Sequence, residues 1–162
     1  MTAQLSTHNK LSAIRTFVTV VAIGLFIGCS AETTVTATEA VVYKSSTCPC
    51  CDDWVKHMKK EGFNLKTEVR DNDMSKIKAA NGVTEQLASC HTAKIDGYVI
   101  EGHVPAADVK RLLKEKPADV VGLTAPGMPM KSPGMQAEGL PPKGYNVIAF
   151  KKDGSTEVYT RY

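Results

Sequence analysis

Residues 41–69 read VVYKSSTCPCCDDWVKHMKKEGFNLKTEV and predict a strand, a helix and a second strand in succession. Val41-Val42-Tyr43 is a short β-branched and aromatic run, which is typical of a buried strand. We expect the helix to begin at Pro49 with Cys48 as its cap, because proline is favoured at the first helical position. Gly62 should end this helix. The apolar positions at helical spacing are Cys51, Trp54, Val55 and Met58.

The next segments continue the alternation of strands and helices. Phe63 to Val69 places apolar residues at every second position, which predicts a half-buried strand. Met74 to Ala80 predicts a short helix that stops at Asn81-Gly82. Thr84 and Gln86 indicate another helix cap, followed by a segment that leads to Cys90.

The C-terminal half contains two hairpin signals and a long loop. Asp96-Gly97 lies between two β-branched runs and predicts a hairpin, and Asp153-Gly154 predicts another. Between them, Pro105 should open a helix, and a Pro- and Gly-rich stretch at 122–142 predicts a long loop. The order of elements over 41–162 predicts an α/β, thioredoxin-like fold with a C-terminal β-hairpin and a long Met/Pro/Gly loop.

The first 28 residues have the pattern of a signal peptide of the lipoprotein type. Lys10 and Arg15 supply positive charge ahead of an apolar run from Phe17 to Ile27. Eleven residues are too few to cross a bilayer core of about 30 Å as a helix, so the run predicts a leader rather than a transmembrane anchor. We therefore expect the domain to work in the periplasm.

Cys29 follows the apolar run, and its surroundings are compatible with two modes of processing. Phe26-Ile27-Gly28-Cys29 resembles a lipobox, which would make Cys29 a lipidation site and the protein a membrane-anchored lipoprotein. In a diderm bacterium the anchor would lie in the outer membrane. The alternative is ordinary cleavage after Ala31. Residues 29–40 are rich in Thr and Ala and predict a flexible tether.

The charge of the chain argues against one class of function. The formal net charge is +3, but Lys10 and Arg15 belong to the leader, so the chain from Cys29 onward carries a net charge of +1. Only 6% of the residues are aromatic. A nearly neutral domain with few aromatic side chains lacks the electrostatic signature of nucleic-acid binding. We expect no nucleic-acid partner.

Three cysteines, Cys48, Cys50 and Cys51, crowd the predicted start of the first helix. Free amide groups and the helix dipole stabilise thiolates there. Three thiolates in close contact repel one another, and a soft cation such as Cu(I) relieves that repulsion. Exported cysteines also form disulfides, so a structural or redox bridge is the alternative.

Cys90 is the fourth cysteine of the mature domain and the remaining candidate thiolate ligand. An even number of thiols also permits a scaffold with two bridges, such as Cys48–Cys51 with Cys50–Cys90. Parity alone does not choose between a disulfide scaffold and a metal site.

Further candidate metal ligands flank these cysteines in the sequence. His91 adjoins Cys90, and His103 precedes the helix predicted to open at Pro105, where the alternative role is capping. Met128, Met130 and Met135 lie on the Pro- and Gly-rich loop without the spacing of a helix face. Their thioethers are soft ligands suited to Cu(I), and the alternative is that they cover the hydrophobic core.

Four motifs occur in the chain, in this order: STCPCC (46–51), SCHTA (89–93), EGHVPA (101–106), and GMP (127–129) followed by SPGM (132–135). Together they resemble the CopG-type periplasmic copper-resistance proteins, a cysteine-rich family long described as a domain of unknown function. The resemblance covers about residues 41–151. It implies a thioredoxin-like fold, copper bound by the cysteines in a sulfur-bridged cluster of several ions, and a role in copper tolerance alongside copper-efflux systems.

Three hypotheses follow for the function. The first is an exported copper-binding protein that holds Cu(I) in a multi-cysteine site and that interconverts copper oxidation states if it is redox-active. The second is a thiol–disulfide oxidoreductase that uses Cys48 and Cys51, which have the two-residue spacing of a redox pair. The third is a disulfide-stapled lipoprotein that holds partner proteins. The sequence assigns no catalytic residue.

Overall fold

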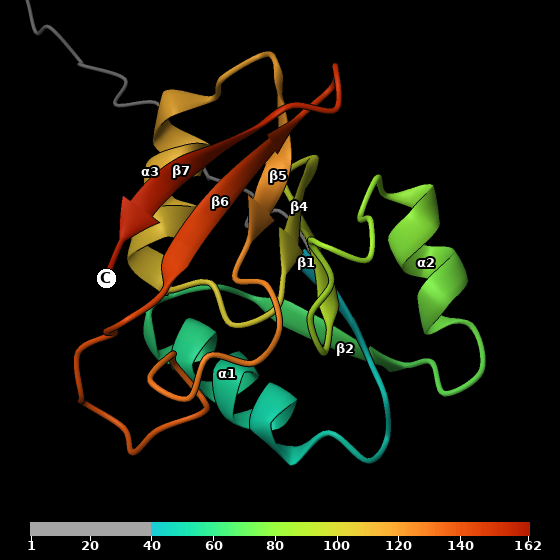
Figure 1. Cartoon of the computed structure of the whole chain (residues 1–162). Helices are drawn as coiled ribbons and strands as arrows, with labels where there is room; N and C mark the ends of the chain where they lie inside the picture. Colours follow the sequence, from blue (N-terminus) through green and yellow to red (C-terminus); the bar gives the residue numbers. More distant parts are fainter. Residues whose placement is uncertain (1–39) are drawn as a thin grey trace, which may run out of the picture. The chain divides into compact units, whose positions relative to one another are not determined.

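The structure, a computed structural model, describes residues 40–162 (Figure 1). In chain order its elements are β1 (Ala40–Lys44), α1 (Pro49–Lys60), β2 (Leu65–Val69), α2 (Met74–Ala80), β3 (Thr92–Ile95), β4 (Tyr98–Glu101), α3 (Ala106–Glu115), β5 (Val120–Thr124), β6 (Asn146–Lys151) and β7 (Thr156–Arg161). The predicted signal peptide and Cys29 lie outside the described residues, as does the predicted tether except for Ala40, which begins β1. Within the described part of the chain, no helix is long and apolar enough to cross a membrane.

The strands of residues 40–162 form one sheet in the order β2-β1-β3-β4-β5-β6-β7. β1 and β2 pair in parallel through α1, and β4 and β5 pair in parallel through α3. The other neighbouring strands are antiparallel. The hairpin of β3 and β4 turns at Asp96-Gly97, whose φ angles of +49° and +84° suit a tight two-residue turn. The predicted α/β class and both predicted hairpins are confirmed.

α1 forms where the sequence predicts it and packs its apolar face on the sheet. Pro49 is the first helical residue, and Gly62 follows the end of the helix with φ +94°. Trp54 Nε1 donates a hydrogen bond to the Val104 carbonyl at 2.8 Å, which ties α1 to the segment before α3. The buried side chains of α1 are Cys51, Trp54, Val55 and Met58.

The sheet separates two hydrophobic clusters of unequal size. Val99 and Ile100 are consecutive in β4, yet Ile100 belongs to the larger cluster and Val99 to the smaller one. Neighbouring side chains of a strand point to opposite faces, so both faces of β4 are buried. The larger cluster includes the apolar faces of α1 and α3. The smaller one consists of Val83, Leu87, Val99 and Phe150.

The burial of β2 differs from the alternation predicted over Phe63 to Val69. Leu65 is buried, but Thr67 is exposed and Val69 exposes 55% of its surface. β2 is the outermost strand on its side of the sheet, so its side chains have a strand neighbour on one side only. The position of β2 at the edge of the sheet, and not the alternation in its sequence, therefore decides which of its side chains are buried.

Two further predictions were wrong. Residues 84–88 form turns in place of the helix predicted from Thr84 and Gln86, with hydrogen bonds between residues three apart. The long loop begins later than predicted, because Gly122 lies inside β5. A Cβ on Gly122 would clash with the Val99 carbonyl of β4, so glycine is what allows these two strands to lie so close.

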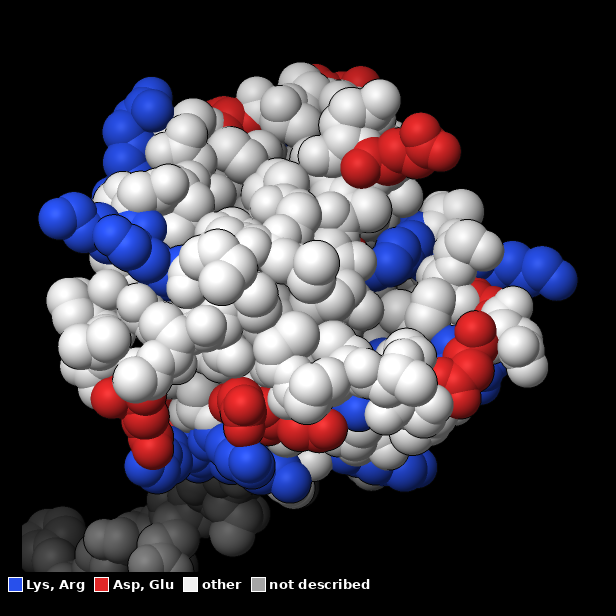
Figure 2. Space-filling view, turned by 60° about the horizontal axis from the view of Figure 1, so that its bottom comes forward, with Lys and Arg blue, Asp and Glu red and all other residues white. Residues whose placement is uncertain are grey.

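One face of the molecule carries charges of both signs. Figure 2 shows acidic and basic side chains mixed along its lower rim, around a centre that is largely uncharged. On this face, the described residues form no continuous basic surface of the kind that binds a phosphate backbone.

Candidate metal centre

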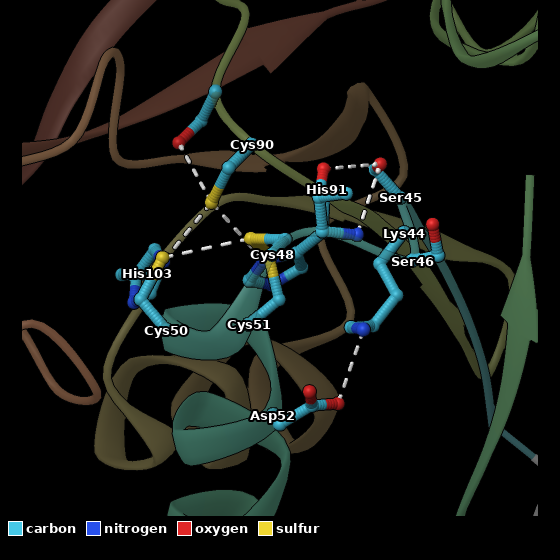
Figure 3. Close-up of a disulfide and its surroundings, with 12 residues drawn as sticks. Lys44, Ser45, Ser46, Cys48, Cys50, Cys51, Asp52, Cys90, His91 and His103 are labelled. Atoms are coloured by element: carbon cyan, nitrogen blue, oxygen red, sulfur yellow. Dashed lines mark hydrogen bonds and ion pairs between the residues drawn. A yellow bond between two sulfur atoms is a disulfide. The ribbon is translucent and has the colours of Figure 1, made fainter. Parts of the chain in front are cut away.

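The first cysteines lie where β1 ends and α1 begins (Figure 3). The connecting loop is fixed by Asp71, which accepts hydrogen bonds from Ser45 Oγ at 2.9 Å and from the Ser46 amide at 2.7 Å. Cys48 occupies the cap position of α1 without a side-chain cap hydrogen bond, and Pro49 follows it. The amide groups of the first helical turn are therefore available to stabilise negative charge on sulfur.

Four sulfur atoms converge at this end of α1. The Sγ atoms of Cys48, Cys50, Cys51 and Cys90 all lie within 4.8 Å of one another. Cys48 and Cys51 form a disulfide, and Cys50 Sγ lies 3.5 Å from Cys48 Sγ (Figure 3). Cys50 and Cys90 are free thiols. Of the two bridges considered from the sequence, Cys48–Cys51 is formed and Cys50–Cys90 is not.

Cys90 enters the cluster from the segment that precedes β3. Burial, followed by the nearby Cys50, raises the pKa of the Cys90 thiol to about 11. Cys90 is therefore protonated at neutral pH in the metal-free protein. A metal ion that binds this sulfur must displace the proton.

His103 points one ring nitrogen at Cys90. Its Nδ1 lies 2.7 Å from the Pro133 carbonyl, and a carbonyl only accepts, so Nδ1 carries the proton. The lone pair of Nε2 then faces Cys90 Sγ at 3.0 Å. Burial lowers the pKa of His103 and so favours the neutral ring. The hydrogen bond to the Pro133 carbonyl opposes this shift but does not reverse it. His103 does not cap α3, because Pro105 occupies the cap position.

His91 is fully buried beside the same sulfur. Its Nδ1 lies 3.5 Å from Cys90 Sγ, and its ring centroid lies 4.3 Å from that of Trp54 and 5.2 Å from that of His103. Burial, and then the nearby His103, lowers the pKa of His91 well below its usual value. Within residues 40–162, His91 Nε2 is buried without a hydrogen-bond partner. A buried unpaired ring nitrogen is costly, and metal ligation is one way to satisfy it.

The two histidines form a second donor group with two of the cysteines. Ligand atoms of Cys51, Cys90, His91 and His103 lie within 4.8 Å of one another. Cys51 and Cys90 thus belong to both groups. Thiolates and neutral imidazoles together suit copper, while hard cations prefer oxygen ligands.

The three methionines of the long loop differ in exposure. Met128 exposes 58% of its surface and Met130 exposes 71%, whereas Met135 is half-buried. Met128 and Met130 are therefore not part of the buried core.

Two glycines hold this loop against the cysteine segments. A Cβ on Gly134 would lie 2.6 Å from the Trp54 amide nitrogen and 2.8 Å from the Cys50 carbonyl oxygen, so the loop packs directly on the first turn of α1. Gly127 donates its N–H to the Ala88 carbonyl at 2.9 Å, and its own carbonyl accepts a hydrogen bond from Ser89. Met128 and Met135 follow these two glycines in the sequence.

Sequence reasoning missed two residues that shape the site. It placed Trp54 only on the core face of its helix, whereas the indole also packs against His91. It gave no role to Glu101, which is fully buried two residues before His103. A charged residue at the end of a mostly apolar strand was the available signal for Glu101.

Comparisons with known proteins identify relatives of this chain. Residues 87–135 match a family model described as "Protein of unknown function, DUF411". Two solved structures, described as "Copper resistance protein copG- Form 1" and "Form 2", are each 40% identical to this chain, with TM-scores of 0.70 and 0.69. The matches cover 78% and 77% of this chain and 98% of each of those chains. A comparison with curated proteins gives no match. At this identity over almost their whole length, the chain belongs to the CopG family of copper-resistance proteins.

Proposed function

We propose that this protein binds copper as Cu(I) for copper tolerance, with Cys48, Cys50, Cys51 and Cys90 as thiolate ligands. The observation that carries the proposal is the convergence of these four sulfurs within 4.8 Å. Thiolates select Cu(I) over hard cations. The description of the similar structures as copper-resistance proteins supports copper as the metal.

Copper binding and thiol oxidation are coupled in this proposal. The Cys48–Cys51 disulfide removes two of the four ligands, so full binding requires its reduction. In the reverse direction, forming one disulfide from two thiolates releases two electrons, which reduce two Cu(II) ions to Cu(I). The reduced site would hold Cu(I), whereas formation of the disulfide would change the oxidation state of copper and leave the site with two fewer thiolates.

Several Cu(I) ions can share the available ligands. Cys51 and Cys90 belong to both donor groups, which supports a site in which bridging thiolates link more than one ion. We propose His91 and His103 as additional ligands, because both rings are neutral and lie beside Cys90 Sγ.

The methionines would interact with copper at the edge of the site. Met135 follows Gly134, which packs on the first turn of α1, so its thioether is suited to shielding bound copper. Met128 and Met130 are exposed and would contact Cu(I) on its way to the thiolates.

We also propose that the fold is thioredoxin-like. The β1-α1-β2 unit with parallel strands, the β3-β4 hairpin and the α3 that follows it support this assignment. In such an arrangement the cysteines lie at the start of the first helix, as Cys48, Cys50 and Cys51 do.

The location of the protein is proposed from the sequence alone. The signal-peptide pattern and the lipobox-like Phe26-Ile27-Gly28-Cys29 support export to the periplasm and a lipid anchor at Cys29. Copper-efflux or other copper-resistance proteins of that compartment are the proposed partners. Mass spectrometry of the mature N-terminus tests the anchor, and an unacylated chain beginning at Glu32 would contradict it.

Anaerobic titration of the reduced protein with Cu(I) tests the copper assignment. The wild-type protein should take up copper, and a variant with serine at positions 48, 50, 51 and 90 should take up none. Cys29→Ser is the matched control, because it removes a cysteine that the proposal does not assign to the copper site. Equal copper stoichiometry in the four-serine variant and the wild type would refute the assignment.

A second candidate function is thiol–disulfide exchange, which the Cys48–Cys51 disulfide at the start of α1 favours. Cys50 Sγ, only 3.5 Å from Cys48 Sγ, would compete in such exchange. Insulin reduction by the metal-free protein distinguishes the two functions. Rapid turnover without tight Cu(I) binding would favour the oxidoreductase, and tight binding without turnover favours the copper-binding protein.

A further inference from the structure

Glu101, the last residue of β4, is fully buried although it carries a carboxyl group. The Ser89 amide donates to its Oε1 at 2.6 Å, and the Thr92 hydroxyl donates to its Oε2 at 2.7 Å. The Lys78 ammonium group forms an ion pair with the same Oε1. All three partners donate to the carboxyl group, so both oxygens of Glu101 are in use.

These contacts fix the segment that carries Cys90. Residues 89–91 precede β3 and lie outside the named strands, so they lack the support of a regular ladder. Glu101 holds the Ser89 amide on one side of Cys90. On the other side, the His91 carbonyl accepts a hydrogen bond from the Gly102 amide at 2.9 Å. Two consecutive residues, Glu101 and Gly102, therefore hold the backbone by hydrogen bonds on both sides of Cys90.

Lys78 balances the buried charge of Glu101. α2 contributes no buried residue, yet the Lys78 side chain is only 15% exposed and its Nζ also lies 3.3 Å from Thr92 Oγ1. Removing one member of a buried ion pair strands the other charge, whereas replacing both members with uncharged groups of similar size is often tolerated. This difference allows a positioning role to be separated from a role in folding.

We propose that Glu101 is a positioning residue for the copper site, an inference that rests on the proposed function. Its carboxylate holds the Ser89 amide and thereby keeps the Cys90 sulfur within reach of the other three. Glu101 acts through the backbone and is not itself a ligand. Groups that orient metal ligands in this way typically change metal affinity about 10- to 100-fold when they are removed.

Two double variants that both remove the charge pair test this inference. Lys78→Met with Glu101→Gln keeps a carbonyl that accepts from Ser89 and an amide group that donates to Thr92. Lys78→Met with Glu101→Leu keeps only the size of the side chain. Anaerobic Cu(I) titration should give the Gln variant an affinity close to wild type and the Leu variant an affinity about 10- to 100-fold lower.

Alkylation of the copper-loaded proteins adds a readout that general destabilisation would not give. In the Leu variant, Cys90 should become reactive while Cys48, Cys50 and Cys51 stay protected. Equal affinity and equal protection of Cys90 in both double variants would overturn the inference and leave the copper assignment standing. An equal loss of affinity in both would also overturn it, because the retained hydrogen bond would then have no effect.

The wild-type titration separates this inference from the proposed function. If wild-type protein bound no Cu(I), the proposed function would fail and this inference with it. If the Leu double variant does not fold, Glu101→Asp replaces it, because aspartate keeps the charge opposite Lys78 but withdraws the carboxylate from Ser89 by one methylene. Wild-type affinity and full protection of Cys90 in Glu101→Asp would overturn the inference, and weaker binding with exposed Cys90 supports it.

Discussion

The Cys90 thiol of the metal-free protein should ionise far above the pH at which a free cysteine does. Burial is the main cause, Cys50 adds to it, and together they raise the pKa from 9.0 to about 11. At about pH 8, roughly one thiol in ten is ionised when its pKa is about 9, compared with roughly one in a thousand when it is about 11. Folding should therefore lower the thiolate fraction of Cys90 about a hundredfold.

Pulsed alkylation with iodoacetamide, read by tryptic mass spectrometry, measures this shift. Cys90 is the only cysteine in the peptide 79–94, so its rate is resolved from the others. Because only the thiolate reacts, the rate should rise about tenfold per pH unit from about pH 7 to about pH 10 in the folded protein. In denaturant the rate should level off near pH 9, which provides the control. A folded-state rate that levels off at or below about pH 9 would refute the argument from burial.

Four further predictions concern the loop, the core and the thiols. Gly134→Ala should lower stability by about 1–3 kcal/mol in urea unfolding, because its Cβ would lie 2.6 Å from the Trp54 amide nitrogen; unchanged stability would contradict the close packing. Trp54→Phe should lower the free energy of unfolding, measured by calorimetry, by about 1–3 kcal/mol, because it leaves the buried Val104 carbonyl without a hydrogen-bond donor. An unchanged free energy of unfolding would argue against that hydrogen bond. Protein with the Cys48–Cys51 disulfide intact should bind less Cu(I) than reduced protein in anaerobic metal analysis, and equal uptake would mean that the disulfide does not block the site. Cu(I) affinity, measured with a competing chelator, should strengthen with rising pH by about tenfold per pH unit for each thiol proton displaced, and a pH-independent affinity would mean that no thiol is deprotonated on binding.

The parts of the fold that were predicted from the sequence depend on local signals. Pro49 and the apolar face that follows it specify α1 within twelve residues. Asp96-Gly97 specifies its hairpin because both residues adopt positive φ in a two-residue turn. Such signals act over a few residues, so they hold whatever the rest of the chain does.

The errors arose where distant parts of the chain decide the structure. Val69 is exposed because β2 is at the edge of the sheet, and the sequence of β2 does not encode that position. Gly122 belongs to a strand because the Val99 carbonyl of β4 comes so close to it. Thr84 begins a series of turns that place Leu87 in the smaller hydrophobic cluster, which a helix cap signal alone could not foresee.

In the candidate site, too, the features that local sequence specifies were predicted, and those that depend on distant segments were not. Cys48, Cys50 and Cys51 were identified because they are adjacent at a predicted helix start. The tautomer of His103 depends on the Pro133 carbonyl, thirty residues later, and only the folded loop brings the two together. The spacing of Cys48 and Cys51 predicted this bridge as one option, and only the folded structure shows which pairing forms.

Protection of the thiols by bound copper is the most direct test of a shared four-sulfur site. Reduced full-length protein is loaded with Cu(I) without oxygen, pulsed with an alkylating reagent and digested with trypsin. Cys90 is then read in peptide 79–94, and Cys48, Cys50 and Cys51 are distinguished by fragmentation of peptide 45–56. The copper assignment predicts that Cys48, Cys50, Cys51 and Cys90 lose reactivity together. Alkylation of Cys90 at the same rate with and without copper, while the other three are protected, would contradict it.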